Sequence, residues 1–183
     1  MKLRKPTEVC ITVDTEFSIG GNFEDPELAP IAEPIVLGTV SGNEHALGFL
    51  LDCLSEFRAQ ATFSVEALQT AYFGDEPMGG IARRIAQAGQ DVQLHLHPCW
   101  LHYESNSTLH PARAPNDSCA GRSDAELDHF FQFGVSAFLR WGAAIARGSS
   151  VGQLPGRRKL LSGGRQIGHC FELQYCTPTT SSC

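Results

Sequence analysis

The chain alternates two patterns of hydrophobic residues along its first 140 positions. Short, largely β-branched or alternating apolar runs predict buried strands at residues 9–13, 61–65 and 91–97. Between and after them, apolar residues recur every three or four positions, which predicts helices over residues 44–59, over 81–88 and from 123 onward. This threefold order of strand and helix predicts an α/β fold built on a parallel sheet or barrel.

Local signals predict where these helices begin and end. Ser41 with Glu44, and Ser123 with Glu126, each match the S-x-x-E capping box that opens a helix. Gly89 is well placed to end the middle helix. The expected buried faces consist of Leu47, Leu50, Leu51, Leu54 and Phe57 in the first helix, and of Leu127, Phe130, Phe131, Val135 and Phe138 in the third. Residues 18–40 are rich in Gly and Pro and predict a long loop over the end of the first strand.

Composition narrows the class of protein. A chain of 183 residues with 42% hydrophobic and 19% charged residues is typical of one globular domain. The net charge of −6 argues against nucleic acid as a partner, because phosphate binding needs a basic surface. No apolar run reaches the roughly 18 residues needed to span a membrane. The basic start of the chain lacks an apolar segment behind it, so we expect a cytoplasmic protein.

The last part of the chain differs from the rest. From Gly148 onward Gly, Ser, Thr, Arg and Cys dominate, and no strand or helix period persists. We therefore expect a domain over residues 7–145 and an irregular, disordered or out-of-frame tail over 146–183.

Pairs of metal-binding side chains occur at the ends of two predicted strands. Asp14 and Glu16 end the first, and His95 and His97 end the third. Residues i and i+2 of a strand share a face, and the carboxyl ends of parallel strands meet at one edge of the sheet. Either pair alone is compatible with ordinary surface residues. Together they predict one divalent ion, zinc most of all, since two imidazoles and a carboxylate are a typical catalytic zinc ligand set.

Three segments also match a known family. The runs Ile11–Glu16, Ala61–Glu66 and Val92–Pro98 resemble, in order and spacing, motifs of the polysaccharide deacetylases (the NodB-like group, carbohydrate esterase family 4). The resemblance covers residues 7–145 and implies a deformed (β/α) barrel that hydrolyses N- or O-linked acetyl groups on a sugar or polysaccharide precursor. It implies Asp14 as the general base.

The same resemblance assigns the other site residues. It implies His95 and His97 as metal ligands, with Glu16 as the third ligand or as a partner of a ligand. Cys99 stands where the family's usual second histidine lies, which makes its thiolate an alternative ligand. Apart from the resemblance, the position of Trp100 just after the histidine motif makes it a candidate for stacking on a sugar or, equally, for packing in a loop.

For four further residues near or beyond these motifs, the sequence gives weaker evidence of a functional role. His102 and Tyr103 could stack on a sugar or simply pack in a loop. Glu66 could reach the site or cap the next helix. His129 has no partner in register with it in the sequence, so we expect it to be a surface residue.

The resemblance stops after about residue 144. The family's arginine motif, later strands and late histidine are not recognisable, and a back-translation of residues 153–168 read one base later resembles a family segment. We therefore hypothesise a frameshift near residues 145–150. Because a closed barrel needs about 250 residues, we expect this one to be incomplete at its C-terminal end. Three functions stay open: a deacetylase impaired by that loss, a non-catalytic carbohydrate- or metal-binding remnant, and a plain α/β domain.

Overall fold

A three-stranded parallel sheet organises the structure, a computed structural model that describes residues 9–104 and 117–142. Its strands are β1 (Thr12–Thr15), β4 (Thr62–Glu66) and β5 (Asp91–His95), in the spatial order β1-β4-β5. The pairing register aligns Asp14 with Ser64 on β4 and Glu66 with His95 on β5. All three strands predicted from the sequence are confirmed, with ends displaced by a few residues.

The two faces of this sheet differ in polarity because side chains alternate along each strand. Phe63, Val65 and Val92 lie on one face and are buried in the core. The opposite face carries Ser64, Gln93 and the acids and histidines of the candidate site. The sheet is therefore apolar on one side and polar on the other.

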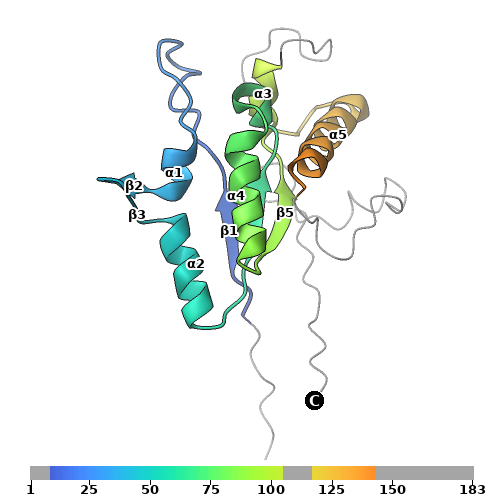
Figure 1. Cartoon of the computed structure of the whole chain (residues 1–183). Helices are drawn as coiled ribbons and strands as arrows, with labels where there is room; N and C mark the ends of the chain where they lie inside the picture. Colours follow the sequence, from blue (N-terminus) through green and yellow to red (C-terminus); the bar gives the residue numbers. More distant parts are fainter. Residues whose placement is uncertain (1–8, 105–116, 143–183) are drawn as a thin grey trace, which may run out of the picture.

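Helices α2 (Leu47–Glu56), α4 (Glu76–Gln87) and α5 (Asp124–Trp141) flank the apolar side, with α4 in front of the strands in Figure 1. The strands follow one another across the sheet in chain order. Right-handed crossovers therefore bring each helix to the same side. A (β/α) barrel has this arrangement too, but the described residues contribute three parallel strands, so the predicted barrel stays a prediction.

The ends of the later helices follow the sequence signals. Ser123 and Glu126 form the predicted capping box, in which the Ser123 hydroxyl accepts the N–H of Glu126 and the Glu126 carboxylate accepts the N–H of Ser123. Gly89 has a φ of +78° just after α4, a conformation that glycine adopts without strain. Helix α4 begins earlier than predicted, at Glu76, with a proline in its first turn.

The capping box expected at Ser41 and Glu44 is wrong. These residues belong to a hairpin of β2 (Thr39–Val40) and β3 (Asn43–Glu44), and Ser41 and Gly42 form its turn with φ values of 51° and 80°. Two successive residues with positive φ suit the tight turn that matches the twist of paired strands. The chain therefore reaches α2 only at Leu47.

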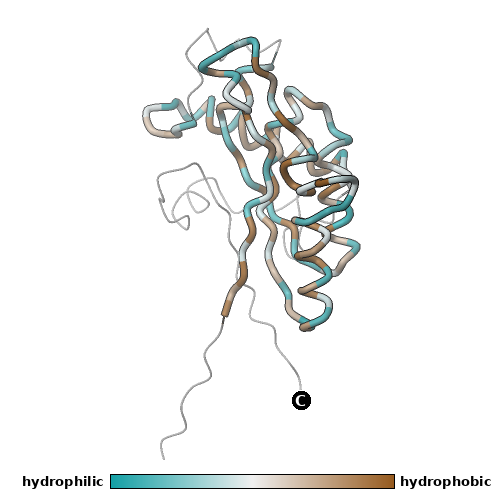
Figure 2. Tube along the Cα trace, turned by 90° about the vertical axis from the view of Figure 1, so that its left-hand side faces the viewer, coloured by the Kyte–Doolittle hydropathy of each residue, from teal (hydrophilic) through white to brown (hydrophobic). Residues whose placement is uncertain are grey.

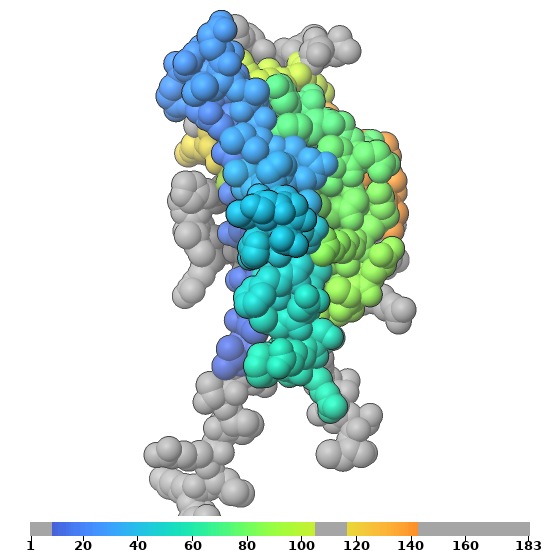
Figure 3. All heavy atoms as spheres, turned by 60° about the vertical axis from the view of Figure 1, so that its left-hand side comes forward, coloured from blue at the N-terminus to red at the C-terminus, as the bar shows by residue number. Residues whose placement is uncertain are grey.

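Two other details differ from the sequence prediction in this region. Phe57, expected on the buried face of the helix, follows the end of α2 and is 74% exposed. The predicted loop over residues 18–40 contains a short helix, α1 (Glu33–Leu37). In Figure 3 this N-terminal segment, in blue and cyan, lies against α4, in green, and an ion pair of 2.8 Å joins Glu44 to Arg84.

Two short helices that the sequence patterns did not predict lie at the carboxyl end of the sheet. They are α3 (Thr70–Phe73), after β4, and the 3₁₀ helix η1 (Pro98–Tyr103), after β5. Their aromatic side chains pack together, with ring centroids 4.7 Å apart for Tyr72 and Tyr103. No helix in the described ranges is both long and apolar enough to cross a bilayer.

Candidate metal centre

Three of the predicted site residues meet at the carboxyl end of the sheet. Glu16 directly follows β1, His95 is the last residue of β5, and His97 lies two positions later. The Nε2 atom of His97 is 2.7 Å from Glu16 Oε2 and 2.8 Å from the Nε2 atom of His95. One donor atom from each of the three residues lies within 4.8 Å of the others. The sequence prediction that these side chains converge agrees with this geometry.

The three clustered side chains differ in burial, and the cluster is open to solvent on one side. The side chains of His95 and His97 are 8% and 16% exposed, whereas that of Glu16 is 44% exposed. His95 ends β5 and His97 follows it, whereas Glu16 follows β1, at the other edge of the described sheet. Solvent or a ligand can therefore reach the cluster from the Glu16 side.

Asp117 joins the site, and the sequence analysis missed it. Its Oδ2 atom is 2.6 Å from His97 Nδ1, and its Oδ1 atom accepts the N–H of Cys99 at 3.5 Å. A carboxylate on the second nitrogen of a histidine fixes the ring and makes its other nitrogen a better metal ligand. The sequence holds no signal for this contact, because Asp117 lies 20 positions after His97 and outside any strand or helix.

His97, Glu16 and Asp117 strongly shift one another's pKa values. Burial lowers the pKa of His97, but its hydrogen bonds with Asp117 and Glu16 outweigh this effect and raise the pKa to about 10. The hydrogen bond with His97 lowers the pKa of Glu16. Burial raises the pKa of Asp117, but the bond and charge of His97 reverse this and leave the pKa below its usual value. Without a metal, His97 is therefore a cation held between two carboxylates.

This donor set fits a divalent ion. Two imidazole nitrogens and one carboxylate oxygen are the ligands that zinc takes in many catalytic sites. The carboxylates that stabilise a protonated His97 would equally stabilise a metal dication beside it. The residues present therefore match the ion that the sequence predicts.

Glu66 lies at the same end of the sheet and is completely buried. Burial raises the pKa of its carboxyl to about 8, although the charge of His97 and backbone N–H groups of Leu68 and His97 act in the opposite direction. The sequence left two roles open, a site residue or a helix cap. The Leu68 contact precedes α3 and is cap-like, while the charge of His97, which lowers the pKa of Glu66, places the carboxyl near the site.

Asp14, the predicted base, is not part of the three-residue cluster. It is exposed on β1, two positions before Glu16, so both side chains leave the same face of the strand. Asp14 and Glu16 both line a groove of about 460 Å³ that also includes Ile35, His45 and Leu50. Neither histidine of the cluster lines this groove, so it connects Asp14 to the cluster only through Glu16, and the role of Asp14 as base stays a prediction.

Trp100 and Cys99 lie deeper than a binding role would suggest. Trp100 is 2% exposed, and its ring lies 5.7 Å from that of Phe73 and 6.0 Å from that of Tyr103, measured between centroids. Burial raises the pKa of the Cys99 thiol, which also interacts with the Asp117 carboxylate. Cys99 is not one of the clustered donors of the described residues, and the stacking role of Trp100 stays a prediction.

His129, which was expected to be a surface residue, is partly buried and contacts an acidic side chain. Its Nε2 atom lies 2.8 Å from Glu104 Oε2, in a contact that joins α5 to the end of η1. The two residues are 25 positions apart, so no local pattern could indicate the contact.

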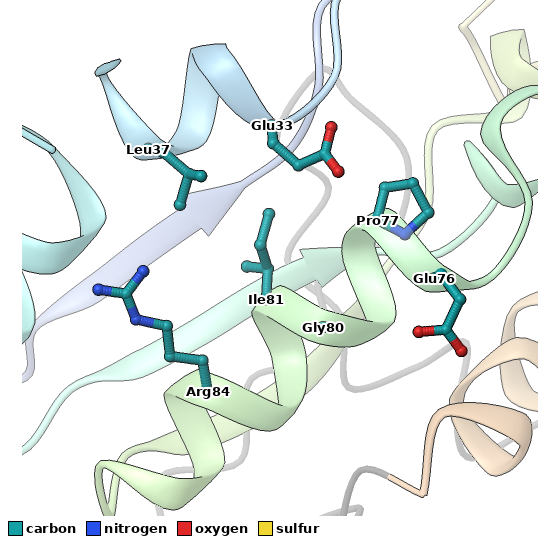
Figure 4. A pocket seen from close by; sticks show the side chains of 7 residues that line it. All are labelled: Glu33, Leu37, Glu76, Pro77, Gly80, Ile81 and Arg84. Atoms are coloured by element: carbon teal, nitrogen blue, oxygen red, sulfur yellow. The ribbon is translucent and has the colours of Figure 1, made fainter. Parts of the chain in front are cut away.

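A second hollow lies between α1 and α4, away from the cluster. Figure 4 shows Leu37 and Glu33 facing Ile81 and Arg84 across it. None of its lining residues belongs to the metal cluster. The hollow therefore adds nothing to the candidate site.

The expected tail, residues 146–183, and the hypothesised frameshift lie outside the described residues. Comparisons with known proteins found no matching family model, no matching curated protein and no matching solved structure.

Proposed function

We propose that this chain is a metal-dependent hydrolase that removes N- or O-linked acetyl groups from a sugar or polysaccharide precursor. Glu16, His95 and His97 would hold the divalent ion, which we expect to be zinc. The observation that carries the proposal is the convergence of these three donors within 4.8 Å at the open carboxyl end of a parallel sheet. The motif resemblance to polysaccharide deacetylases supports the choice of reaction.

Each side chain has a task that its position supports. A bound zinc ion would lower the pKa of a water molecule and polarise the acetyl carbonyl. Asp117 holds the ring of His97 through Nδ1 and leaves Nε2 directed at Glu16. Asp14 is the candidate to take the proton of the attacking water, because it is exposed on the groove that Glu16 also lines.

The second candidate is a non-catalytic carbohydrate- or metal-binding remnant of the same fold. The observation that favours it is the open sheet, since the described strands number three while the resemblance implies a closed barrel. A chain of this kind would keep the ligands and bind zinc, but would not release acetate. The cytoplasmic location expected from the sequence stays a prediction.

The first experiment measures zinc binding, by competition with a chelating dye at neutral pH. We expect the parent chain to bind one zinc ion, and His95→Ala and Glu16→Gln to bind at least about tenfold more weakly. His102→Ala is the matched control, because His102 is exposed and lies outside the cluster. A parent chain whose zinc affinity equals that of His95→Ala would overturn the proposed metal centre.

The second experiment separates catalysis from binding. Acetate release is measured on a panel of N- and O-acetylated sugars, with zinc-loaded parent and variants. We expect Asp14→Asn to keep zinc affinity and lose acetate release, and Glu16→Gln to lose both. Release by the parent that survives in Asp14→Asn would remove Asp14 as the base. A zinc-binding parent that releases no acetate from any member of the panel would favour the remnant.

A further inference from the structure

Gln69 connects the end of β4 to the segment that carries Glu16. Its side chain is completely buried, at the turn that leads into α3. The Oε1 atom accepts the backbone N–H of Phe17 at 3.0 Å, and the Nε2 atom donates to the carbonyl of Glu66 at 3.0 Å. Phe17 directly follows Glu16. This one amide therefore determines where the backbone after Glu16 lies relative to β4.

The same turn also contacts the end of β5. The N–H of Ala67 donates to the carbonyl of His95 at 3.1 Å. The buried Glu66 carboxylate accepts the N–H of Leu68 through Oε1, within the turn itself. The turn of residues 66–69 is thus linked by hydrogen bonds to the segments that carry Glu16 and His95.

These contacts matter because the ligands lie at or beyond the end of the sheet. Pairing of β1 with β4 ends at Thr15, and pairing of β4 with β5 ends at His95. The backbones of Glu16, Phe17 and His97 follow these last pairs and need other partners. Gln and Glu are rarely buried completely, and burying them without hydrogen bonds costs free energy. The burial of Gln69 is compensated by its bonds to the backbones of Phe17 and Glu66. That of Glu66 is compensated in part, since Oε1 accepts the N–H of Leu68 while Oε2 has no hydrogen-bond partner among the described residues.

We propose that the turn of residues 66–69 positions the metal centre, with Gln69 setting the place of Glu16 and Glu66 fixing the turn through the N–H of Leu68. The inference rests on the proposed function only for the identity of the ion. Both residues act through the ligands, and neither is a ligand itself, since the clustered donors come from Glu16, His95 and His97.

The test compares two glutamines that make the same kind of bond at opposite ends of β4. Gln69→Met removes the acceptor for Phe17 and keeps the side chain of similar length. Gln90→Met is the matched control, because Gln90 Oε1 accepts the N–H of Ala61 at 2.8 Å, just before β4 begins. We expect both variants to unfold at lower temperature. Only Gln69→Met should also weaken zinc binding, by about tenfold or more, as loss of a group that orients a ligand does.

A second pair of variants tests the turn itself. Glu66→Gln keeps an acceptor oxygen for the N–H of Leu68, whereas Glu66→Leu removes it. We expect the zinc affinity of Glu66→Gln to stay close to that of the parent, and Glu66→Leu to bind about tenfold more weakly. This pair decides the question if Gln69→Met does not fold. Equal zinc affinity in both Glu66 variants, at temperatures where both are folded, would contradict the inference.

A metal-free readout separates this inference from the proposed function. Nitrogen NMR of the His97 ring reports its contact with Glu16, which Glu16→Gln abolishes as a reference. We expect Gln69→Met to move the His97 signals in the same direction as Glu16→Gln, and Gln90→Met to leave them in place. If the parent does not bind zinc, the proposed function fails and this signal alone decides the inference. Unmoved His97 signals and an unchanged zinc affinity in Gln69→Met would show that Gln69 only stabilises the fold.

Discussion

Gly134 packs α5 closely against the segment that carries the histidines. A Cβ atom placed on it would lie 2.5 Å from Leu96 Cδ2 and 3.1 Å from Leu94 Cδ1. Leu96 is 5% exposed and lies between His95 and His97 in the sequence, so it has little room to move away. Gly134→Ala should therefore push on the backbone between the two ligands.

The size of the effect follows from two opposing contributions. Replacing a glycine inside a helix by alanine stabilises by about 1 kcal/mol through helix propensity. Inserting a methyl group into a packed core costs about 1–3 kcal/mol. Gly80→Ala on α4 is the matched control, because the nearest atom to its added Cβ is Arg83 Nη2 at 3.9 Å. The propensity gain cancels between the two variants, so their difference of about 1–3 kcal/mol isolates the packing cost.

The assay is thermal unfolding of both variants without metal, followed by zinc competition. We expect Gly80→Ala to raise the unfolding midpoint and Gly134→Ala to lower it, with a separation of about 4 °C per kcal/mol. Zinc should bind more weakly to Gly134→Ala than to Gly80→Ala. If Gly134→Ala is as stable as Gly80→Ala, then α5 does not pack on β5 in the way described.

Three further predictions concern stability and reactivity away from the ligands. Ser123→Ala should destabilise by about 1 kcal/mol in chemical unfolding, because it removes the hydroxyl that caps α5; an unchanged midpoint would contradict the capping box. Arg140 lowers the pKa of Asp75 through a two-point hydrogen bond, so the parent should exceed Asp75→Asn in stability at neutral pH by up to about 1 kcal/mol. That advantage should disappear as the pH falls through the lowered pKa of Asp75, and an advantage that persists in acid would count against the ion pair. Peptide mapping after brief thiol alkylation should find the exposed Cys10 modified well before Cys99, whose burial raises its pKa; equal rates would show that Cys99 is accessible.

Local patterns predicted the elements whose stability depends on nearby residues. The alternation of Val92, Leu94 and Leu96 indicated β5, and the S-x-x-E spacing of Ser123 and Glu126 indicated the start of α5. The same spacing at Ser41 gave a wrong helix start, because a capping box is a local preference that the positive φ of Ser41 and Gly42 overrides in the hairpin. Spacing alone does not distinguish the two outcomes.

The edge strand β1 and the residues that lead into it show a related limit of the sequence patterns. The apolar run from Val9 predicts a buried strand, yet Val9 and Ile11 are 80% and 39% exposed, and Figure 2 shows this stretch in brown where it leads away from the folded body. β1 has a neighbour on one side only among the described residues. Whether an apolar strand is buried depends on its neighbours in the sheet, which its own residues do not encode.

The sequence by itself determined which side chains could share a metal ion. Residues i and i+2 of a strand point the same way, so Asp14 shares a direction with Glu16 and His95 shares one with His97, and parallel strands end at the same edge. Only the tertiary structure decided which donors meet, because distances depend on strand register and on chain reversals between the strands. It brought Glu16 rather than Asp14 to the histidines and supplied Asp117, 20 positions away, as the partner of His97. Contacts of this kind are set by the packing of the whole chain, and no local pattern specifies them.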